Sequence, residues 1–250
     1  MANKAEKINF VLVHGSWHDG HSWRHVEEHL RSAGHTTQAP TLPGRGEGRD
    51  EDQADITFQD CADTVANAVI TAGLSDIVLV GHSAGGAVIR KAAEQLADRI
   101  RRMVYISPLL SKNGDSILAA VPPDYAALFR DMAAQSADNT VFPPWPVWRD
   151  GFIGDADEAT ARQAFDELHP EPFAPIVEPI DLTLFETLQL PASYINPTED
   201  VVFPMGEWGF FPRMYQAVAP CRLVQMSGGH EVMYSDPEAL AKALIIAGRN

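Results

Sequence analysis

Runs of consecutive apolar residues alternate along this chain with segments in which apolar residues recur every three or four positions. An unbroken apolar run is typical of a strand buried on both faces of a sheet, and the longer spacing is typical of one face of a helix. The expected strands are Ile8–Val13, Thr36–Ala39, Ile77–Val80, Arg102–Ser107, Ala192–Asn196 and Arg222–Met226. The helical spacing falls at 23–33, 58–72, 88–96, 207–218 and 240–247. This order predicts an α/β protein with a mostly parallel, doubly wound sheet and helices on both faces.

Three helix ends carry local signals. Thr57 with Asp60 has the spacing of a capping box at the start of the helix at 58–72. The segment Ser235–Glu238 has the same spacing before the last helix, and Gly34 is a natural stop for the first one.

The alternation stops between Pro108 and about Leu190. Prolines cluster there, helical stretches are short (125–134 and 158–168), and we expect no strand. A segment this long is more than an ordinary connection between two strands. We therefore expect residues 1–250 to form a single domain in which 108–190 is a cap insertion over the mouth of a site. Its rings either line an apolar substrate pocket or pack the cap onto the body: Phe142, Trp145, Trp148 and Phe152.

The amino-acid composition limits the kinds of molecule that this protein is expected to bind. The formal charge of −15 argues against nucleic acid and anionic membranes, which both require basic surface. The polar start of the chain has no signal-peptide pattern, no apolar run is long enough to span a membrane, and the two cysteines form no close pair. We expect a cytoplasmic protein with a small-molecule partner. The acidic, glycine-rich segment from Arg45 to Asp55 is predicted to be an exposed loop.

One motif carries chemistry directly. Gly81-His82-Ser83-Ala84-Gly85 fits G-x-S-x-G between a predicted strand and a predicted helix. Such a turn is strained and projects the serine hydroxyl above the sheet edge. Because its backbone is tight, the residues two positions before and after the serine must be nearly free of side chain. Ser83 is the predicted nucleophile.

A serine nucleophile needs a base, and the base needs an orienting acid. Of nine histidines, His230 is distinguished by its place after the last strand and before the last helix. Asp200 follows the preceding strand, so the order Ser, Asp, His is kept. Since the carboxyl ends of parallel strands share one edge, the three side chains can converge. Glu199 and Asp181 remain alternatives for the acid.

Acyl transfer also needs hydrogen-bond donors for the developing oxyanion. The N–H of Ala84, directly after the nucleophile, is one candidate. The second is expected from the loop after the first strand, with the N–H of Ser16 preferred over that of Trp17. The side chains of Trp17 and His18 either face the substrate pocket or pack within the loop. His14 and His82, which flank glycines, are predicted to be structural, and we expect no metal and no cofactor because no metal-ligand spacing occurs.

These motifs resemble one branch of the α/β-hydrolase superfamily, which holds plant methylesterases, hydroxynitrile lyases and bacterial pyrethroid and carbamate ester hydrolases. The similarity lies at both ends of the chain and is poor in the cap. The matching segments are Phe10–His18 with Trp23, Ala33–His35, Val80–Gly86, Thr198–Asp200 with Pro204, and Gly228–His230. Membership implies an α/β-hydrolase fold, the triad Ser83, Asp200 and His230, and an oxyanion hole from the N–H groups of Ser16 and Ala84.

The resemblance favours a serine hydrolase that cleaves a small, largely apolar carboxylic ester or carbamate through an acyl-enzyme. The alternatives are a lyase, or another enzyme that cleaves C–C or C–N bonds with the same triad, and a ligand-binding protein with little turnover. The lyases carry threonine, cysteine and lysine where this chain has Gly15, Ala84 and Glu231. A lysine beside the base would stabilise departing cyanide, whereas Glu231 opposes it. Hydrolysis is therefore the preferred prediction.

Overall fold

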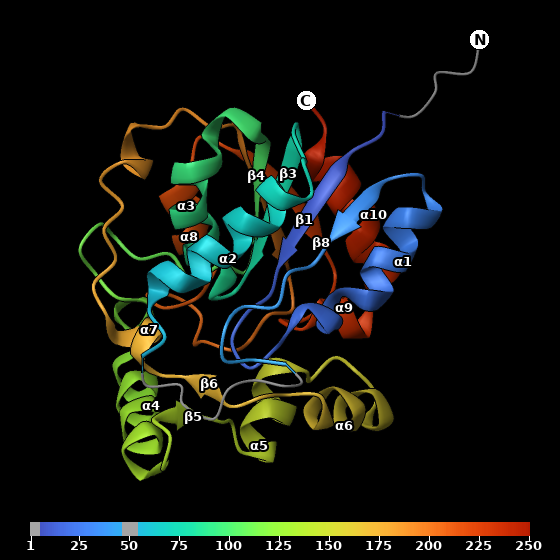
Figure 1. The fold of residues 1–250 in the computed structure, drawn as a ribbon. Helices are drawn as coiled ribbons and strands as arrows, with labels where there is room; N and C mark the ends of the chain where they lie inside the picture. Colours follow the sequence, from blue (N-terminus) through green and yellow to red (C-terminus); the bar gives the residue numbers. More distant parts are fainter. Residues whose placement is uncertain (1–5, 47–54) are drawn as a thin grey trace.

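A parallel six-stranded sheet forms the centre of the molecule (Figure 1). The structure, a computed structural model, describes residues 6–46 and 55–250. The strand order is β2-β1-β3-β4-β7-β8, and every pairing in this sheet is parallel. The strands are β1 (Asn9–Val13), β2 (Thr36–Gln38), β3 (Ile77–His82), β4 (Ile100–Ile106), β7 (Ala192–Pro197) and β8 (Arg222–Met226). The predicted doubly wound parallel sheet is confirmed.

The sheet separates two hydrophobic cores. Successive residues of β1 point to opposite faces, so Phe10 and Leu12 pack in one core while Val11 and Val13 pack in the other. One face is covered by α1 (Arg24–Ser32) and α10 (Pro237–Gly248), and the other by α2 (Phe58–Thr71), α3 (Gly85–Leu96) and α8 (Arg213–Val218). The apolar runs are unbroken because both faces of the central strands are buried.

Residues 108–190 run mainly along one end of the sheet, below α1 and α2 in Figure 1. The segment contains α4 (Pro123–Gln135), α5 (Trp145–Val147), α6 (Glu158–Asp166), α7 (Ala174–Val177), the π-helical turn η4 (Trp148–Phe152), and the 3-10 turns η3 (Ile117–Ala120) and η5 (Phe185–Thr187). Trp17, which follows β1, contacts this group, so the group lies at the carboxyl end of the strands. The position supports the proposal that the segment is a cap on a single domain.

The expectation of a cap without strands was wrong. β5 (Thr140–Val141) and β6 (Glu171–Pro172) pair antiparallel as a separate two-stranded sheet. Each strand has only two residues, and β6 includes a proline, Pro172. Such short segments show no period along the sequence.

The prediction of an exposed loop from Arg45 was also wrong at its start. Arg45 is 7% exposed, because its guanidinium forms an ion pair with Glu171 inside the protein. Gly46 is buried as well. Residues 47–54 of the expected loop lie outside the described residues.

Helix starts follow local hydrogen bonding. The capping box at Thr57 and Asp60 is confirmed, with both reciprocal hydrogen bonds present. The one expected at Ser235 is wrong: Asp236 caps α10 by accepting from the Ala239 N–H, and Ser235 ends the short helix α9 (Val232–Ser235). The helix expected at 207–218 begins only at Arg213.

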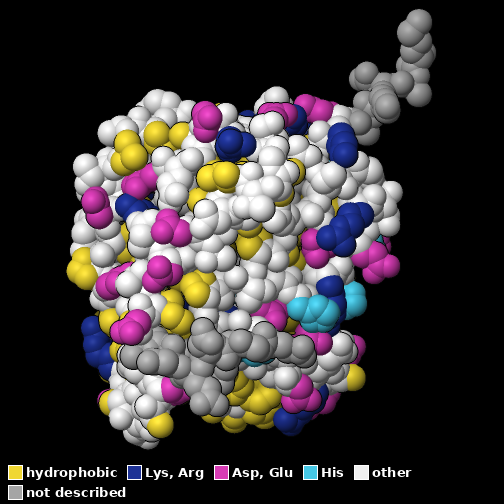
Figure 2. Space-filling model, viewed as in Figure 1, with side chains coloured by type: hydrophobic (Ala, Val, Ile, Leu, Met, Phe, Trp, Pro, Cys, Tyr) yellow, Lys and Arg dark blue, Asp and Glu magenta, His cyan; other side chains and the backbone are white. Residues whose placement is uncertain are grey.

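Acidic side chains are scattered over the face seen in Figure 2 and form no single cluster. No helix within residues 6–46 and 55–250 is long and apolar enough to cross a membrane.

Candidate active site

Ser83 occupies a strained turn between β3 and α3. Its φ of 49° lies in the left-handed region, which residues with side chains seldom adopt. Three backbone hydrogen bonds hold the turn: the Ser83 N–H donates to the carbonyl of Ile106 (3.1 Å), and the Ser83 carbonyl accepts from the N–H groups of Gly86 (2.9 Å) and Leu109 (2.8 Å). The backbone of Ser83 is therefore held in place by the end of β4, the start of α3 and the segment after β4.

The glycines around Ser83 are required by close backbone contacts. A Cβ on Gly81 would lie 2.6 Å from the carbonyl oxygen of Gly85, and a Cβ on Gly85 would lie 2.5 Å from that of His14. Both distances are shorter than real Cβ contacts, so a side chain at either position would force the backbone apart. The expected need for glycine at both positions is confirmed.

His230 and Asp200 are joined by a hydrogen bond. Nδ1 of His230 lies 2.8 Å from Oδ2 of Asp200, and both side chains are almost fully buried. The second Asp200 oxygen accepts from the Val202 N–H at 3.1 Å. An ionised carboxylate accepts only, so Nδ1 carries the proton and Nε2 is left with a lone pair. A buried imidazole in this tautomer can accept a proton at Nε2.

The other two candidate acids lie elsewhere. The carboxylate of Glu199 accepts from the Gly228 N–H (3.4 Å), and that of Asp181 accepts from the Thr183 N–H (2.9 Å). Neither contacts the base, so the geometry favours Asp200 as the orienting carboxylate.

His82 links the Ser83 turn to the loop that carries His230. Its Nε2 lies 3.1 Å from the carbonyl oxygen of His230 and donates to it, and the two rings lie 4.7 Å apart. Burial lowers the pKa of His82 well below the ordinary value, so the ring is neutral. His82, the residue before Ser83, therefore ties this turn to the backbone of His230.

Charges around His230 set its proton affinity. Burial lowers its pKa, but the charge of Asp200 and the hydrogen bond to it raise the pKa more, and Glu231 and Asp155 add to the upward effect. The net shift is upward from 6.5. Burial likewise raises the pKa of Asp200, but the His230 pair and hydrogen bonds from Ser107 and Val202 outweigh it, so the net shift is downward. Both pKa shifts favour the charged form of this pair, an imidazolium beside a carboxylate.

Glu231 places a second buried carboxylate beside the base. It is 1% exposed, and its Oε2 lies 3.3 Å from Nε2 of His18. Burial raises the pKa of Glu231. Nδ1 of His18 lies 2.7 Å from the carbonyl oxygen of Ser16, so this pair also reaches the loop after β1.

The loop after β1 is held so that the Ser16 N–H stays free. The Trp17 N–H donates to Glu171 at 2.9 Å, which removes Trp17 as a candidate donor to an oxyanion. Within the described part of the chain, the N–H groups of Ser16 and Ala84 have no acceptor. His14 has the structural place expected for it: its Nε2 accepts from the Leu42 N–H at 3.0 Å, and its Nδ1 donates to the Gly15 carbonyl.

Aromatic rings surround the base. The ring of Phe152 lies 5.5 Å from that of His230, Trp148 stacks on Phe152 at 5.7 Å, and Trp17 contacts Phe152 at 5.1 Å. The ring of His18 lies 5.6 Å from that of Trp148. Four of the six candidate pocket residues are therefore brought together near His230.

The other two candidate pocket residues lie elsewhere. Phe142 and Trp145 pack against Phe165 of α6. Sequence reasoning missed Phe210, whose ring is 5.1 Å from that of His230. It lies in an irregular segment that was expected to be helical, so no period singled it out.

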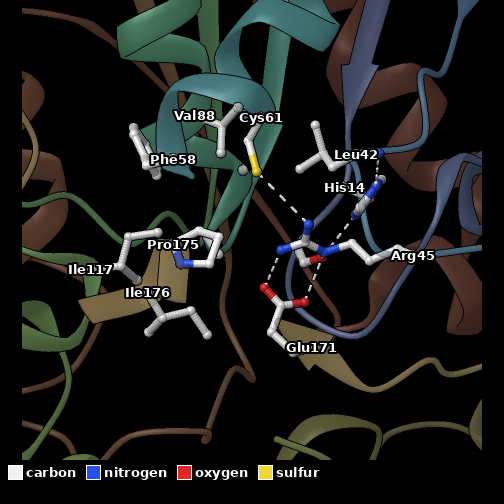
Figure 3. Close-up of a pocket in the computed structure, with 13 residues that line it drawn as sticks. His14, Leu42, Arg45, Phe58, Cys61, Val88, Ile117, Glu171, Pro175 and Ile176 are labelled. Carbon is white, nitrogen blue, oxygen red and sulfur yellow. Dashed lines mark hydrogen bonds and ion pairs between the residues drawn. The ribbon is translucent and has the colours of Figure 1, made fainter. Parts of the chain in front are cut away.

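A cavity beside the nucleophile turn contains a buried ion pair (Figure 3). It is lined by His14, Gly15, Ala84 and Gly85 and by apolar side chains of α2, α3 and the cap. Figure 3 shows the Glu171 carboxylate facing the Arg45 guanidinium, with Cys61 on the far side of that guanidinium. Neither Arg45 nor Glu171 was a candidate site residue, because they are 126 positions apart and belong to no motif.

The site offers few free metal ligands. Ligand atoms of His82, His230 and Glu231 lie within 4.8 Å of one another. However, Nε2 of His82 and Nδ1 of His230 already have hydrogen-bond partners. This arrangement suits proton transfer better than metal binding.

The chain is similar to known hydrolases along almost its whole length. A model of the alpha/beta hydrolase family matches residues 10–243. A carbendazim hydrolyzing esterase from Nocardioides sp. (strain SG-4G) is 29% identical over 253 residues, which cover 96% of this chain and 99% of that protein. A pyrethroid hydrolase from Sphingobium wenxiniae is 23% identical and covers 94% of this chain and 86% of that protein.

A solved structure also matches the chain along nearly its whole length. It is described as an extracellular alpha/beta-hydrolase from a Paenibacillus species with structural and functional homology to tobacco salicylic acid binding protein 2. The TM-score is 0.93 at 32% sequence identity, and the match covers 97% of this chain and 100% of that one.

Proposed function

Because this chain is an esterase-type member of the alpha/beta hydrolase family, we propose that it hydrolyses a small, largely apolar carboxylic ester or carbamate with Ser83 as nucleophile. The observation that carries the proposal is the buried His230–Asp200 hydrogen bond (2.8 Å), which lies at the same sheet edge as the strained Ser83 turn. A buried histidine oriented by a carboxylate is the base that a serine nucleophile requires.

In the first half-reaction, Ser83 Oγ attacks the substrate carbonyl carbon while Nε2 of His230 takes the hydroxyl proton. The negative charge that develops on the carbonyl oxygen is stabilised by the N–H groups of Ser16 and Ala84. Asp200 stabilises the imidazolium. The bond to the alcohol then breaks, and His230 returns the proton to the leaving oxygen, which leaves an acyl- or carbamoyl-enzyme and a free alcohol.

In the second half-reaction, His230 takes a proton from water, and the hydroxide attacks the acyl carbon. The Ser83–acyl bond breaks, and Ser83 Oγ recovers its proton from His230. An ester yields its carboxylic acid by this route, and a carbamate yields a carbamic acid. No other reactant is needed.

The surroundings of the base support an apolar substrate. Phe152, Phe210 and Trp148 lie at or near the His230 ring and exclude water from that side. Similarity to a carbendazim hydrolyzing esterase and to a pyrethroid hydrolase supports a small ester-like substrate.

Lyase chemistry is disfavoured on steric grounds as well as by charge. A Cβ on Gly15 would lie 2.9 Å from Cβ of Ser83 and 3.0 Å from Nδ1 of His82. This turn therefore has no room for the threonine of the lyases. Glu231, where those enzymes carry lysine, puts a carboxylate beside the base.

The test is hydrolysis of p-nitrophenyl acetate and butyrate by the natural chain and by Ser83→Ala. We expect the variant to lose essentially all activity while its circular dichroism and unfolding midpoint stay the same. Ser32→Ala, at the exposed end of α1, is the matched control and should keep full activity. Equal activity of the natural chain and Ser83→Ala would contradict the assignment of the nucleophile.

Labelling with a fluorophosphonate separates a reactive serine from an inert one. A mass increase on the peptide that contains Ser83 is expected, and it should be absent from Ser83→Ala. An unlabelled natural chain that hydrolyses no ester would favour the ligand-binding alternative.

A further inference from the structure

Trp17 is held at three atoms by the segment 108–190. Its N–H donates to the Glu171 carboxylate (2.9 Å), its carbonyl accepts from the His169 N–H (2.7 Å), and its indole Nε1 donates to the carbonyl of Val141 (3.1 Å). Glu171 and Val141 are paired across the short β5–β6 sheet. At Trp17, the loop that follows β1 is therefore fastened to this short sheet.

Glu171 is the centre of this attachment. Its Oε2 accepts from the Trp17 N–H and from Nε of Arg45, each at 2.9 Å, and its Oε1 accepts from Nη2 of Arg45. The side chain is 2% exposed and that of Arg45 is 4% exposed. Arg45 is in turn held by the carbonyl of Pro43 (2.7 Å). The carboxylate is thus rigid, fully paired and shared between the body, the cap and the loop.

The backbone of Trp17 needs such a restraint. Its φ is 65°, in the left-handed region that a bulky residue seldom adopts. Residues in such conformations persist only where their surroundings determine them, and they cluster at functional sites. The residue before Trp17 is Ser16, whose free N–H is one of the two oxyanion donors of the proposed reaction.

We propose that Glu171 is a positioning residue for the oxyanion hole, which holds Trp17 in its strained conformation and thereby directs the Ser16 N–H toward the reacting carbonyl. The proposal rests on the proposed function. Glu171 acts through the Trp17 backbone, and Arg45 fixes the direction of its carboxylate. The cap would then set the catalytic rate even for substrates too small to reach its rings.

Two double variants isolate the hydrogen bond to Trp17. Removing Glu171 alone would leave the positive charge of Arg45 buried and unpaired. Both variants therefore also carry Arg45→Met, which removes that charge. Arg45→Met with Glu171→Leu has no acceptor for the Trp17 N–H. Arg45→Met with Glu171→Gln keeps an amide oxygen that can accept it. Glu158→Gln is the control, because it removes an exposed carboxylate of the cap that forms ion pairs with Arg149 and Arg162.

The first readout is steady-state hydrolysis of p-nitrophenyl acetate. We call the double variant with Glu171→Leu the leucine pair and the one with Glu171→Gln the glutamine pair. We expect kcat of the leucine pair to be at least about tenfold lower than that of the glutamine pair. Loss of an oxyanion donor lowers kcat by ~10²–10³-fold, which is the upper limit of the expected effect. KM should differ by less than about twofold, because the interaction lost belongs to the transition state. Glu158→Gln should match the natural chain.

The second readout does not need activity. In the leucine pair, deuterium uptake of a peptide spanning residues 14–18 should rise by more than one amide, because the whole loop loosens. In the glutamine pair it should stay near that of the natural chain. Equal uptake and equal kcat in the two double variants would overturn the proposal. A natural chain that hydrolyses no ester and is not labelled by the fluorophosphonate would instead contradict the proposed function. The deuterium uptake of residues 14–18 would still show whether Glu171 holds the loop.

Discussion

Nδ1 of His230 lies 2.8 Å from Oδ2 of Asp200, and neither side chain is more than 4% exposed. Because both groups are shielded from water, this hydrogen bond determines which imidazole nitrogen carries the proton, and it fixes the orientation of the ring. It leaves Nε2 as the basic atom, and the carboxylate charge stabilises the imidazolium once Nε2 has gained a proton.

Asp200→Asn should therefore lower kcat severely while leaving the fold in place. An asparagine has nearly the same shape but stabilises the wrong tautomer or leaves the imidazolium without a countercharge. In a serine triad that change costs about 10⁴ in kcat. Ester hydrolysis at pH 7.5, with the unfolding midpoint measured alongside, tests it.

Asp181→Asn is the matched control, since its carboxylate is exposed and bonded only locally. It should retain full activity. A large loss of kcat with Asp181→Asn and a small loss with Asp200→Asn would instead assign the orienting acid to Asp181.

A second prediction concerns the pH dependence. The pKa of His230 is shifted upward from 6.5, so kcat/KM should rise through an apparent pKa above that value as the base loses its proton. The negative charge of Glu231 favours the protonated imidazolium, so Glu231→Gln lowers the pKa of His230. The rise of kcat/KM on the acid side of the pH profile, called here the acid limb, should then move to lower pH by about half a unit to one unit.

Glu238→Gln, which removes an exposed carboxylate paired with Lys242, should leave the profile where it is. An acid limb that stays in place or moves to higher pH in Glu231→Gln would show that Glu231 does not act on the base through its charge.

The central sheet and the residues at its edge could be predicted from the sequence because their signals are local. Buried parallel strands such as β3 are continuous apolar runs, and the turn at Ser83 demands glycine at Gly81 and Gly85. The order of Asp200 and His230 after two strands then follows from the parallel topology.

The attachments of the cap could not be predicted in this way. Arg45 and Glu171 are 126 positions apart, and each stands in a segment without period. Arg45 begins a glycine-rich, acidic stretch whose composition is typical of an exposed loop, yet one ion pair buries it. Contacts of this kind depend on how the cap packs on the rest of the chain, and no local sequence pattern predicts that packing.

Gly85→Ala should destabilise the protein. The added methyl group would lie 2.5 Å from the His14 carbonyl oxygen and 2.7 Å from that of Val13, both backbone atoms that cannot turn aside. Overpacking of this kind costs about 1–3 kcal/mol, which urea unfolding would detect. Gly151→Ala, where nothing lies within 4 Å of the new Cβ, should change the free energy of unfolding by no more than about 0.5 kcal/mol. Equal stability of the two variants would contradict the steric account.

The last prediction concerns Asp155, which holds the base loop from the side of the cap. Its Oδ2 accepts from the Gly229 N–H (2.8 Å) and from the Ser235 hydroxyl (2.6 Å), the residues on either side of the His230 turn. Its charge also raises the pKa of His230. Asp155→Ala removes both effects, so kcat should fall by about tenfold or more as the ring loses its alignment. The acid limb of kcat/KM should move to lower pH.

Asp157→Ala separates this effect from a general loosening of the cap. Asp157 lies two residues further on and caps α6 by accepting from the Thr160 N–H at 2.8 Å. Its removal should cost about 0.5–2 kcal/mol of stability and leave kcat and the pH profile unchanged. Asp155→Asn should keep part of kcat, because its amide oxygen can still accept from Gly229, but should shift the acid limb as far as alanine does. If Asp155→Ala lost stability alone, as Asp157→Ala does, the carboxylate would be a cap contact with no part in placing the base.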